Sequence, residues 1–131
     1  MKSNSLKFRK LIAAAMAARR NAHAPYSKFR VGAALLTKGG KVYTGVNVEN
    51  ASYGLTNCAE RVAVGKAVSE GHRQFRAIAV VGPSLALSPC GACRQVLAEF
   101  GDCVVICADS RNLRRVRIQM LSELLPHTFK L

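Results

Sequence analysis

The sequence has no tryptophan and few acidic residues. Its 131 residues contain 7 aspartates and glutamates against 20 lysines and arginines, which gives a formal net charge of +13. No apolar run approaches the roughly 20 residues needed to cross a bilayer, so a membrane-spanning segment is not expected. Half of the residues are apolar, which argues against intrinsic disorder despite the charge. The length predicts a single domain over residues 1–131.

The cysteine count is odd, which disfavours a disulfide framework and is typical of a reducing compartment. The cysteines are Cys58, Cys90, Cys93, Cys103 and Cys107. The apolar run 11–18 looks like the core of a signal peptide, but Arg19 and Arg20 follow it where positive charge is not expected. The basic, acid-free segment 1–24 could also be a transit peptide. A first helix over 6–20 explains the pattern more simply, so we expect a cytoplasmic protein.

Hydrophobic periodicity and turn residues predict an α/β fold. The expected helices cover 6–20, 57–69, 91–100 and 119–125, and the expected strands cover 29–36, 42–46, 75–81, 103–108 and 115–118. The third and fourth of these strands are rich in β-branched and apolar residues, as buried parallel strands are. A hairpin followed by strand–helix–strand units implies a mixed sheet with helices on its faces.

Two short segments carry candidate metal ligands, and each lies where a loop enters a predicted helix. They are 57–61, Asn-Cys-Ala-Glu-Arg, and 88–95, Ser-Pro-Cys-Gly-Ala-Cys-Arg-Gln. Cys90 and Cys93 are three residues apart, so both thiols lie on one face of the first helical turn. The positive end of a helix favours thiolates. The pair alone is consistent with zinc binding, and a redox-active pair is the alternative.

Cys58 favours zinc, because it also begins a predicted helix. Three thiolates from two helix N-termini leave the fourth tetrahedral position open, as in a catalytic zinc site. Glu60 would lie beside the metal, within reach of a bound water, where a carboxylate can carry protons. Its alternative role is that of a helix-start carboxylate favoured by the helix dipole.

The predicted site carries an excess of negative charge. Three thiolates and one Zn²⁺ give a net charge of −1, which opposes ionisation of a bound water. Arg61 and Arg94 are the neighbouring cations, and hydrogen bonds from them would withdraw charge from the sulfurs. Gln95, beside Arg94, is a further candidate for this surrounding layer.

These residues resemble the small type of cytidine deaminase that has three cysteine ligands. The zinc-deaminase signature reads Cys58-Ala59-Glu60 and then Pro89-Cys90-Gly91-Ala92-Cys93. The resemblance covers roughly residues 20–129 and includes four further segments: 25–29, 31–35, 47–54 and 123–126. It implies a three-layer fold with a mixed five-stranded sheet and helices on both faces. It also implies that Cys58, Cys90 and Cys93 bind Zn²⁺.

The resemblance further implies hydrolysis of cytidine and deoxycytidine to uridine and deoxyuridine. A water activated at the zinc attacks C4 of cytosine, and Glu60 carries its proton to N3 and then to the departing amine. Asn47 and Glu49 would hold the ribose hydroxyl, and Phe29 would line the base or sugar pocket. The backbone of Ala59 would recognise the pyrimidine.

A homotetramer is also implied, in which Phe129 caps the site of a neighbouring subunit. The alternative for Phe129 is a hydrophobic contact with its own domain. The basic stretch 111–117 is atypically charged for the family. We favour a role in guarding an edge strand against pairing with other chains over a role as an RNA-binding stripe.

Two other functions remain open at this point. One is a deaminase of cytosine in single-stranded RNA or DNA, and the other is a nucleic-acid-binding zinc module without catalysis. Glu49, expected near the 3′ side of the sugar, would repel a phosphodiester. Glu60 has no use beside a purely structural zinc. The same sugar-binding loop disfavours a deaminase of blasticidin-like nucleosides.

Overall fold

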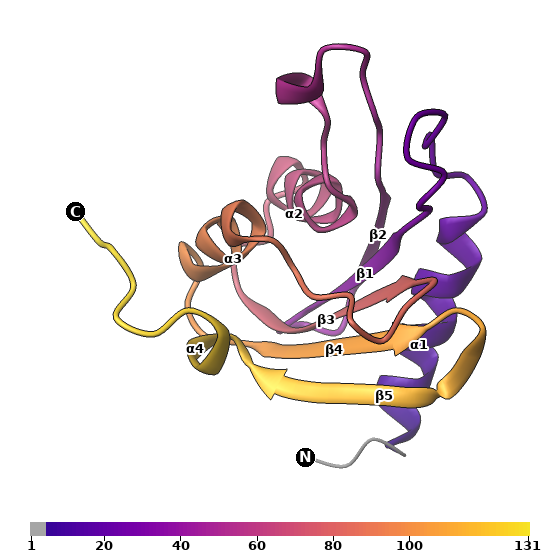
Figure 1. The fold of residues 1–131 in the computed structure, drawn as a ribbon. Coiled ribbons are helices and arrows are strands. Elements are labelled where there is room, and N and C mark those ends of the chain that lie inside the picture. The colour runs from indigo at the N-terminus through magenta and orange to yellow at the C-terminus, as the bar shows by residue number, and fades with distance from the viewer. Residues whose placement is uncertain (1–4) are drawn as a thin grey trace.

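A five-stranded sheet organises the protein, and the computed structural model describes residues 5–131 of it (Figure 1). The strands run in the order β2-β1-β3-β4-β5. Their bounds are β1 Gly32–Thr37, β2 Val42–Val46, β3 Phe75–Gly82, β4 Val104–Asp109 and β5 Asn112–Met120. The strands β3 and β4 are parallel, and the other neighbouring pairs are antiparallel. The predicted mixed sheet is confirmed. The first four residues of the predicted domain and of the basic segment 1–24 lie outside the described residues.

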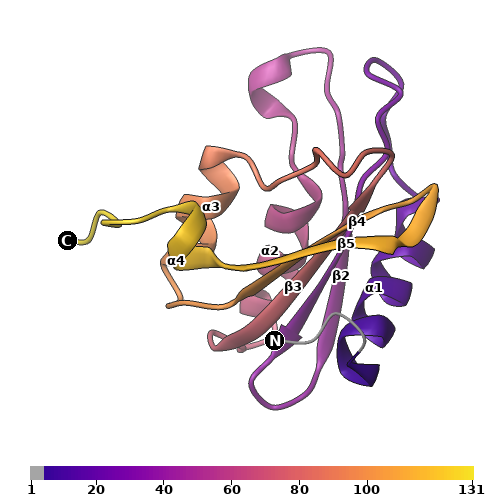
Figure 2. The same cartoon turned by 60° about the horizontal axis from the view of Figure 1, so that its bottom comes forward.

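Helices cover both faces of this sheet, as predicted. Figure 2 shows α2 and α3 on one side of the sheet and α1 on the other. The helices are α1 Leu6–Arg19, α2 Ala59–Ser69, α3 Gly91–Ala98 and α4 Leu121–Leu124, with a short 3₁₀ turn, η1, at Tyr53–Leu55. Among the described residues, no helix combines the length and apolar character needed to span a membrane.

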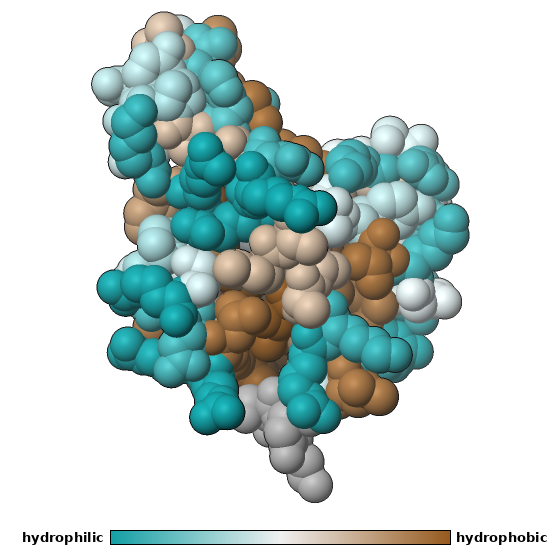
Figure 3. All heavy atoms as spheres, turned by 90° about the vertical axis from the view of Figure 1, so that its right-hand side faces the viewer, coloured by the Kyte–Doolittle hydropathy of each residue, from teal (hydrophilic) through white to brown (hydrophobic). Residues whose placement is uncertain are grey.

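Two apolar cores lie on the two faces of the sheet. The core beneath α2 and α3 includes Val105 and Cys107 of β4, and the core beneath α1 includes Ile106 and Ala108 of the same strand. Successive side chains of a strand point to opposite faces, so β4 contributes to both cores, and its residues 104–108 are all apolar. In the side view of Figure 3, hydrophilic residues border a central apolar area of the outer surface.

The helix α2 lies directly against β2, and Gly45 makes this approach feasible. A Cβ atom at Gly45 would lie 2.3 Å from the carbonyl oxygen of Ala59 and 2.6 Å from the backbone nitrogen of Ala63. Only glycine fits such a contact. The position of the first turn of α2 is therefore set by its contact with the backbone of β2.

The predicted strand 29–36 is wrong at its start, because β1 begins at Gly32. The side chain of Asn47 binds the backbone of the preceding residues, as a neighbouring strand would. Its Oδ1 accepts a hydrogen bond from the Val31 N–H at 2.9 Å, and its Nδ2 donates to the Phe29 carbonyl at 2.8 Å. In this segment a side chain, rather than a neighbouring strand, binds the Val31 N–H and the Phe29 carbonyl.

The last strand is longer than predicted and the last helix is shorter. The prediction was a strand over 115–118, whereas β5 pairs with β4 from Asn112 to Met120. Arg114 and Arg115 are exposed at the sheet edge, so the strand lacks the apolar pattern that identifies a buried strand. The pairing of Met120 with Val104 delays the start of α4. The helix then ends just before Leu125, whose helical conformation Pro126 disfavours.

Candidate metal and active site

Three cysteines from two segments far apart in the sequence meet in space. The Sγ atom of Cys90 lies 3.8 Å from that of Cys58 and 3.5 Å from that of Cys93, and all three sulfurs lie within 4.8 Å of one another. Tetrahedral zinc with Zn–S bonds of about 2.3 Å places its sulfur ligands about 3.8 Å apart. A disulfide needs a separation of about 2.05 Å. The spacing therefore fits a metal site rather than a disulfide.

Cys58 and Cys90 occupy the same position in the two helices that bring the cluster together. Each is the N-cap residue, with an extended backbone, and each carbonyl accepts the first hydrogen bond of its helix, from Val62 and Arg94 respectively. Neither helix has a side-chain cap on its first N–H groups. The sulfurs face the shared cluster, where the positive helix ends favour thiolates.

The pKa values of Cys58 and Cys93 shift in opposite directions. A hydrogen bond from the Cys93 thiol and another from Arg61 lower the pKa of Cys58 to about 5. The thiolate of Cys58 and burial together raise the pKa of Cys93 above its usual value. The raised pKa favours the thiol form of Cys93. A divalent cation would favour the thiolate form instead, because it coordinates the thiolate. This donor set is chemically suited to zinc.

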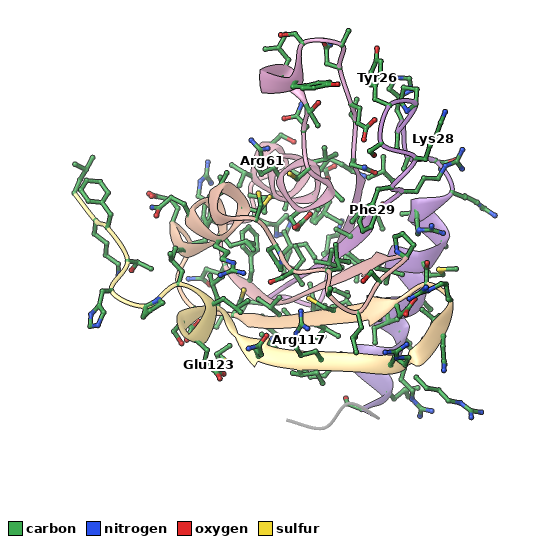
Figure 4. The ribbon with its side chains drawn as sticks, viewed as in Figure 1. Tyr26, Lys28, Phe29, Arg61, Arg117 and Glu123 are labelled. Carbon is green, nitrogen blue, oxygen red and sulfur yellow. The ribbon has the colours of Figure 1, made fainter. Side chains whose placement is uncertain are left out.

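Arg61 lies against the cluster, whereas Arg94 does not. The Nη2 atom of Arg61 is 3.4 Å from Cys58 Sγ and 3.5 Å from the carbonyl oxygen of Thr56 (Figure 4). Its Nε is buried without a hydrogen-bond partner among the described residues. Hydrogen bonding to the Cys58 thiolate raises the pKa of Arg61. This guanidinium is placed to withdraw charge from a sulfur.

The expected contact of Arg94 with the thiolates is not formed. Its Nε donates to the Pro89 carbonyl at 2.7 Å, its Nη1 donates to the Leu124 carbonyl at 2.7 Å, and its Nη2 lies 3.0 Å from Ser88 Oγ. Arg94 thus joins the loop before Cys90 to α4. Gln95 is exposed and lines a surface pocket next to the C-terminal segment, away from the sulfurs.

Glu60 is a buried carboxyl beside the cluster. Its side chain is 5% exposed, and Ala59 before it is fully buried. Burial, reinforced by the nearby charge of Cys58, raises the pKa of Glu60 to about 7. A carboxyl with this pKa can both accept and release a proton near neutral pH. The proton-carrying role expected for Glu60 from the sequence stays a prediction.

The polar side chains of the loop 47–54 bind the protein's own backbone. Glu49 Oε1 accepts hydrogen bonds from the Tyr26 N–H at 3.0 Å and the Ser27 N–H at 3.1 Å, and its Oε2 accepts one from the Ser27 hydroxyl. These bonds, that of the Ser27 hydroxyl foremost, lower the pKa of Glu49. With Asn50, Tyr53 and Thr56, these three residues line a pocket of about 360 Å³. The sequence reasoning assigned no role to Ser27.

Phe29 and Phe129 occupy different surroundings. Phe29 is 37% exposed, and it lies over the end of β3, where its Cε1 would be 3.5 Å from a Cβ atom at Gly82. Phe129 is 71% exposed, in a C-terminal segment that extends away from the body (Figures 1 and 2). The ring is thus largely exposed, and with Gln95 and Ala98 it lines a surface pocket beside α3.

Comparison with known proteins identifies the family. A model described as the cytidine and deoxycytidylate deaminase zinc-binding region matches residues 6–109. The chain belongs to this deaminase family. It is 60% identical over 95 residues to the cytidine deaminase of Sporosarcina psychrophila, covering 70% of this chain and 68% of the relative. It is 56% identical over 106 residues to a probable cytidine deaminase of Dictyostelium discoideum, covering 79% and 72%.

A solved deaminase structure is also closely similar. The crystal structure of cytidine deaminase from Burkholderia pseudomallei superimposes with a TM-score of 0.87 and 52% sequence identity, over 92% of this chain and 98% of that one. The family membership agrees with the cofactor expected from the sequence, since the matched model is a zinc-binding region and three cysteines are placed to bind a metal ion.

Sequence reasoning missed Gly45 as a determinant of the deaminase site. It lies within the predicted strand 42–46, where an isolated glycine is a signal of close backbone approach. That signal was available in the sequence. The identity of the approaching helix was not, because α2 begins 14 residues later, beyond the irregular loop 47–57.

Proposed function

We propose that this chain is a zinc-dependent hydrolase that converts cytidine and deoxycytidine to uridine and deoxyuridine and releases ammonia. Such a reaction on free nucleosides serves pyrimidine salvage. The observation that carries the proposal is the buried carboxyl of Glu60, with its raised pKa, beside three converging thiols. The similar proteins that are named cytidine deaminases support the same activity.

Each residue of the site would have a separate role in the reaction. When bound to Cys58, Cys90 and Cys93, zinc supplies Lewis-acid activation of water. Glu60 would accept one proton from the attacking water and pass it to N3 of the pyrimidine. It would then transfer the second proton to the exocyclic amine as the C4–N bond breaks. Water and cytidine are consumed, uridine and ammonia are formed, and Glu60 regains its starting state. Arg61 would limit the negative charge on Cys58.

We assign substrate orientation to Phe29, Asn47, Glu49 and the backbone of Ala59. Hydrogen bonds from Tyr26 and Ser27 hold Glu49 ionised and in a fixed position, so that it can accept a sugar hydroxyl without reorganising. Asn47 uses one donor and one acceptor on the protein, which leaves its second amide hydrogen and a lone pair for a ligand.

The charge of Glu49 also favours free nucleosides over polynucleotides. A fixed carboxylate near the sugar opposes a phosphodiester at the same place. The basic stretch 111–117 gives little support to deamination of cytosine in RNA or DNA. Arg111 Nη2 and Arg115 Nη1 lie 3.0 Å and 3.7 Å from Asp109 Oδ2. Part of this positive charge is neutralised within the protein.

The assembly is part of the proposal. We infer one domain over residues 1–131, on the support of the single sheet, and a cytoplasmic homotetramer. The exposure of Phe129 supports a role in capping a neighbouring subunit's site.

Ammonia release by the purified protein tests this function. Zinc per subunit is counted, and turnover is measured with cytidine, deoxycytidine and a short cytosine-containing single strand. We expect turnover of both nucleosides and none of the oligonucleotide. Glu60→Gln, which keeps the shape of the side chain, should retain zinc and lose turnover. A zinc-loaded wild-type protein that deaminates neither nucleoside would refute the proposal.

A further inference from the structure

An arginine outside the deaminase signature holds the loop that leads into Cys90. This loop runs back over β4 from the end of β3 to the start of α3 (Figure 1). Arg117, on β5, donates from Nη1 to the Leu85 carbonyl at 2.9 Å and from Nη2 to the Leu87 carbonyl at 2.7 Å. With the bond from Arg94 to the Pro89 carbonyl, three alternate carbonyls of the loop bind guanidinium groups.

The register of the sheet directs Arg117 to this loop. It lies opposite Cys107 in the antiparallel pair of β4 and β5, and directly opposed residues project on the same face. Cys107 belongs to the core beneath α2 and α3, so Arg117 projects on that face and is half-buried (Figure 4). Its neighbours Val116 and Ile118 pack on the opposite face, with α1.

The chemistry of the contact requires arginine. A guanidinium presents donors in a rigid planar fork, so a single side chain can bind two carbonyls in a fixed geometry. A lysine is a point charge on a flexible stem and cannot reproduce this fork. Cys90 needs such support, because it is exposed and begins α3 directly after a loop without regular structure.

We propose that Arg117 is a positioning residue for the zinc site. By fixing the carbonyls of Leu85 and Leu87, it sets the path of the loop and hence the point at which Cys90 presents its sulfur. It acts through the loop on Cys90, and its guanidinium binds the carbonyls of Leu85 and Leu87 rather than the three sulfurs of the cluster. This inference rests on the zinc-dependent function proposed above.

Zinc affinity tests the role without substrate. Arg117→Gln, Arg117→Lys and the control Arg114→Gln are compared with wild type by equilibrium competition against a chromogenic zinc chelator. Arg114 is an exposed residue of the same strand, so its replacement removes the same charge without changing the loop. Groups that orient metal ligands contribute about tenfold or more to affinity, so we expect a loss of about that size in Arg117→Gln. Arg117→Lys should be intermediate, and Arg114→Gln should match wild type.

Geometry at the metal gives a second measurement. Co²⁺ in place of zinc reports the arrangement of thiolate ligands through its visible absorption, which should change in Arg117→Gln and not in Arg114→Gln. At saturating zinc, kcat should fall while KM stays near its wild-type value.

Two results would overturn the proposal. One is wild-type zinc affinity in folded Arg117→Gln, and the other is an equal loss in Arg114→Gln, which would indicate a general effect of charge. Should Arg117→Gln not fold, wild-type zinc affinity in a folded Arg117→Lys would overturn the proposal instead. Because the competition uses no nucleoside, its result is independent of whether the protein deaminates cytidine.

Discussion

Replacement of Gly45 by alanine should displace the helix that carries Glu60. The new Cβ would lie 2.3 Å from the Ala59 carbonyl oxygen, whereas ordinary contact begins at 3.4 Å. The helix α2 and the strand β2 must therefore separate by about 1 Å, since both clashing groups are backbone atoms. Metal sites tolerate errors of only about 0.2 Å in ligand distance, so the sulfur of Cys58 would leave its place in the cluster.

The expected magnitudes follow from this displacement. Overpacking of a tight interface costs about 1–3 kcal/mol, and each kcal/mol lowers Tm by about 4 °C for a protein of this size. A misplacement of about 1 Å at a catalytic group costs on the order of 100-fold in rate. We therefore expect Gly45→Ala to lose more in kcat than its loss of stability explains.

Thermal unfolding, zinc content and cytidine turnover of Gly45→Ala measure these effects. Gly65→Ala is the matched control, because it makes the same change on α2, where a Cβ meets nothing within 4 Å. Alanine in a helix interior is more favourable than glycine by about 1 kcal/mol, so the control should gain stability and keep its activity. Wild-type zinc content and kcat in Gly45→Ala would refute the reasoning.

Three further predictions concern other parts of the structure. Arg61→Ala should reduce kcat more than zinc content, because it removes the donor to the Cys58 sulfur; equal losses of both, or full turnover, would contradict that role. Hydrogen bonds from Arg111 lower the pKa of Asp109 from 3.8 to about 2, so its stabilising effect is complete above pH 4 and is lost as pH falls through 2. Asp109→Asn should lack the loss of stability that titration of Asp109 causes in the wild type. An acid-unfolding profile equal to that of the wild type would contradict this role of Asp109. Phe129→Ala should leave Tm unchanged, because Phe129 is 71% exposed. It should reduce kcat/KM if Phe129 caps the site of a neighbouring subunit. An unchanged kcat/KM would exclude this capping role.

Local sequence signals were sufficient to predict that Cys58, Cys90 and Cys93 meet in one cluster. The spacing of Cys90 and Cys93 places both thiols on one helical turn, and the loop-to-helix boundary at Cys58 repeats the arrangement. Both signals depend on neighbours within a few residues. The layered fold was predictable for the same reason, because the apolar run of β4 indicates a strand covered on both faces.

Contacts that depend on the tertiary fold could not be predicted in this way. The sequence places Arg94 beside Cys93, but its guanidinium binds the carbonyl of Leu124, 30 residues away. The side chain of Asn47 pairs with the backbone of Phe29 and Val31 and so replaces a predicted length of strand. A long polar side chain can reach many hydrogen-bond acceptors, and its neighbours in the sequence do not determine which acceptor it binds.

The uncapped starts of α2 and α3 link metal supply to folding. A side-chain oxygen at an N-cap contributes about 1 kcal/mol, and both helices have a cysteine there whose sulfur turns to the cluster. The ion that gathers those sulfurs therefore also fixes the two helix starts, which lie 32 residues apart in the sequence. A ligand that binds only the folded form shifts the folding equilibrium by mass action. The amount of folded enzyme in a cell would therefore depend on the free zinc concentration as well as on synthesis of the chain.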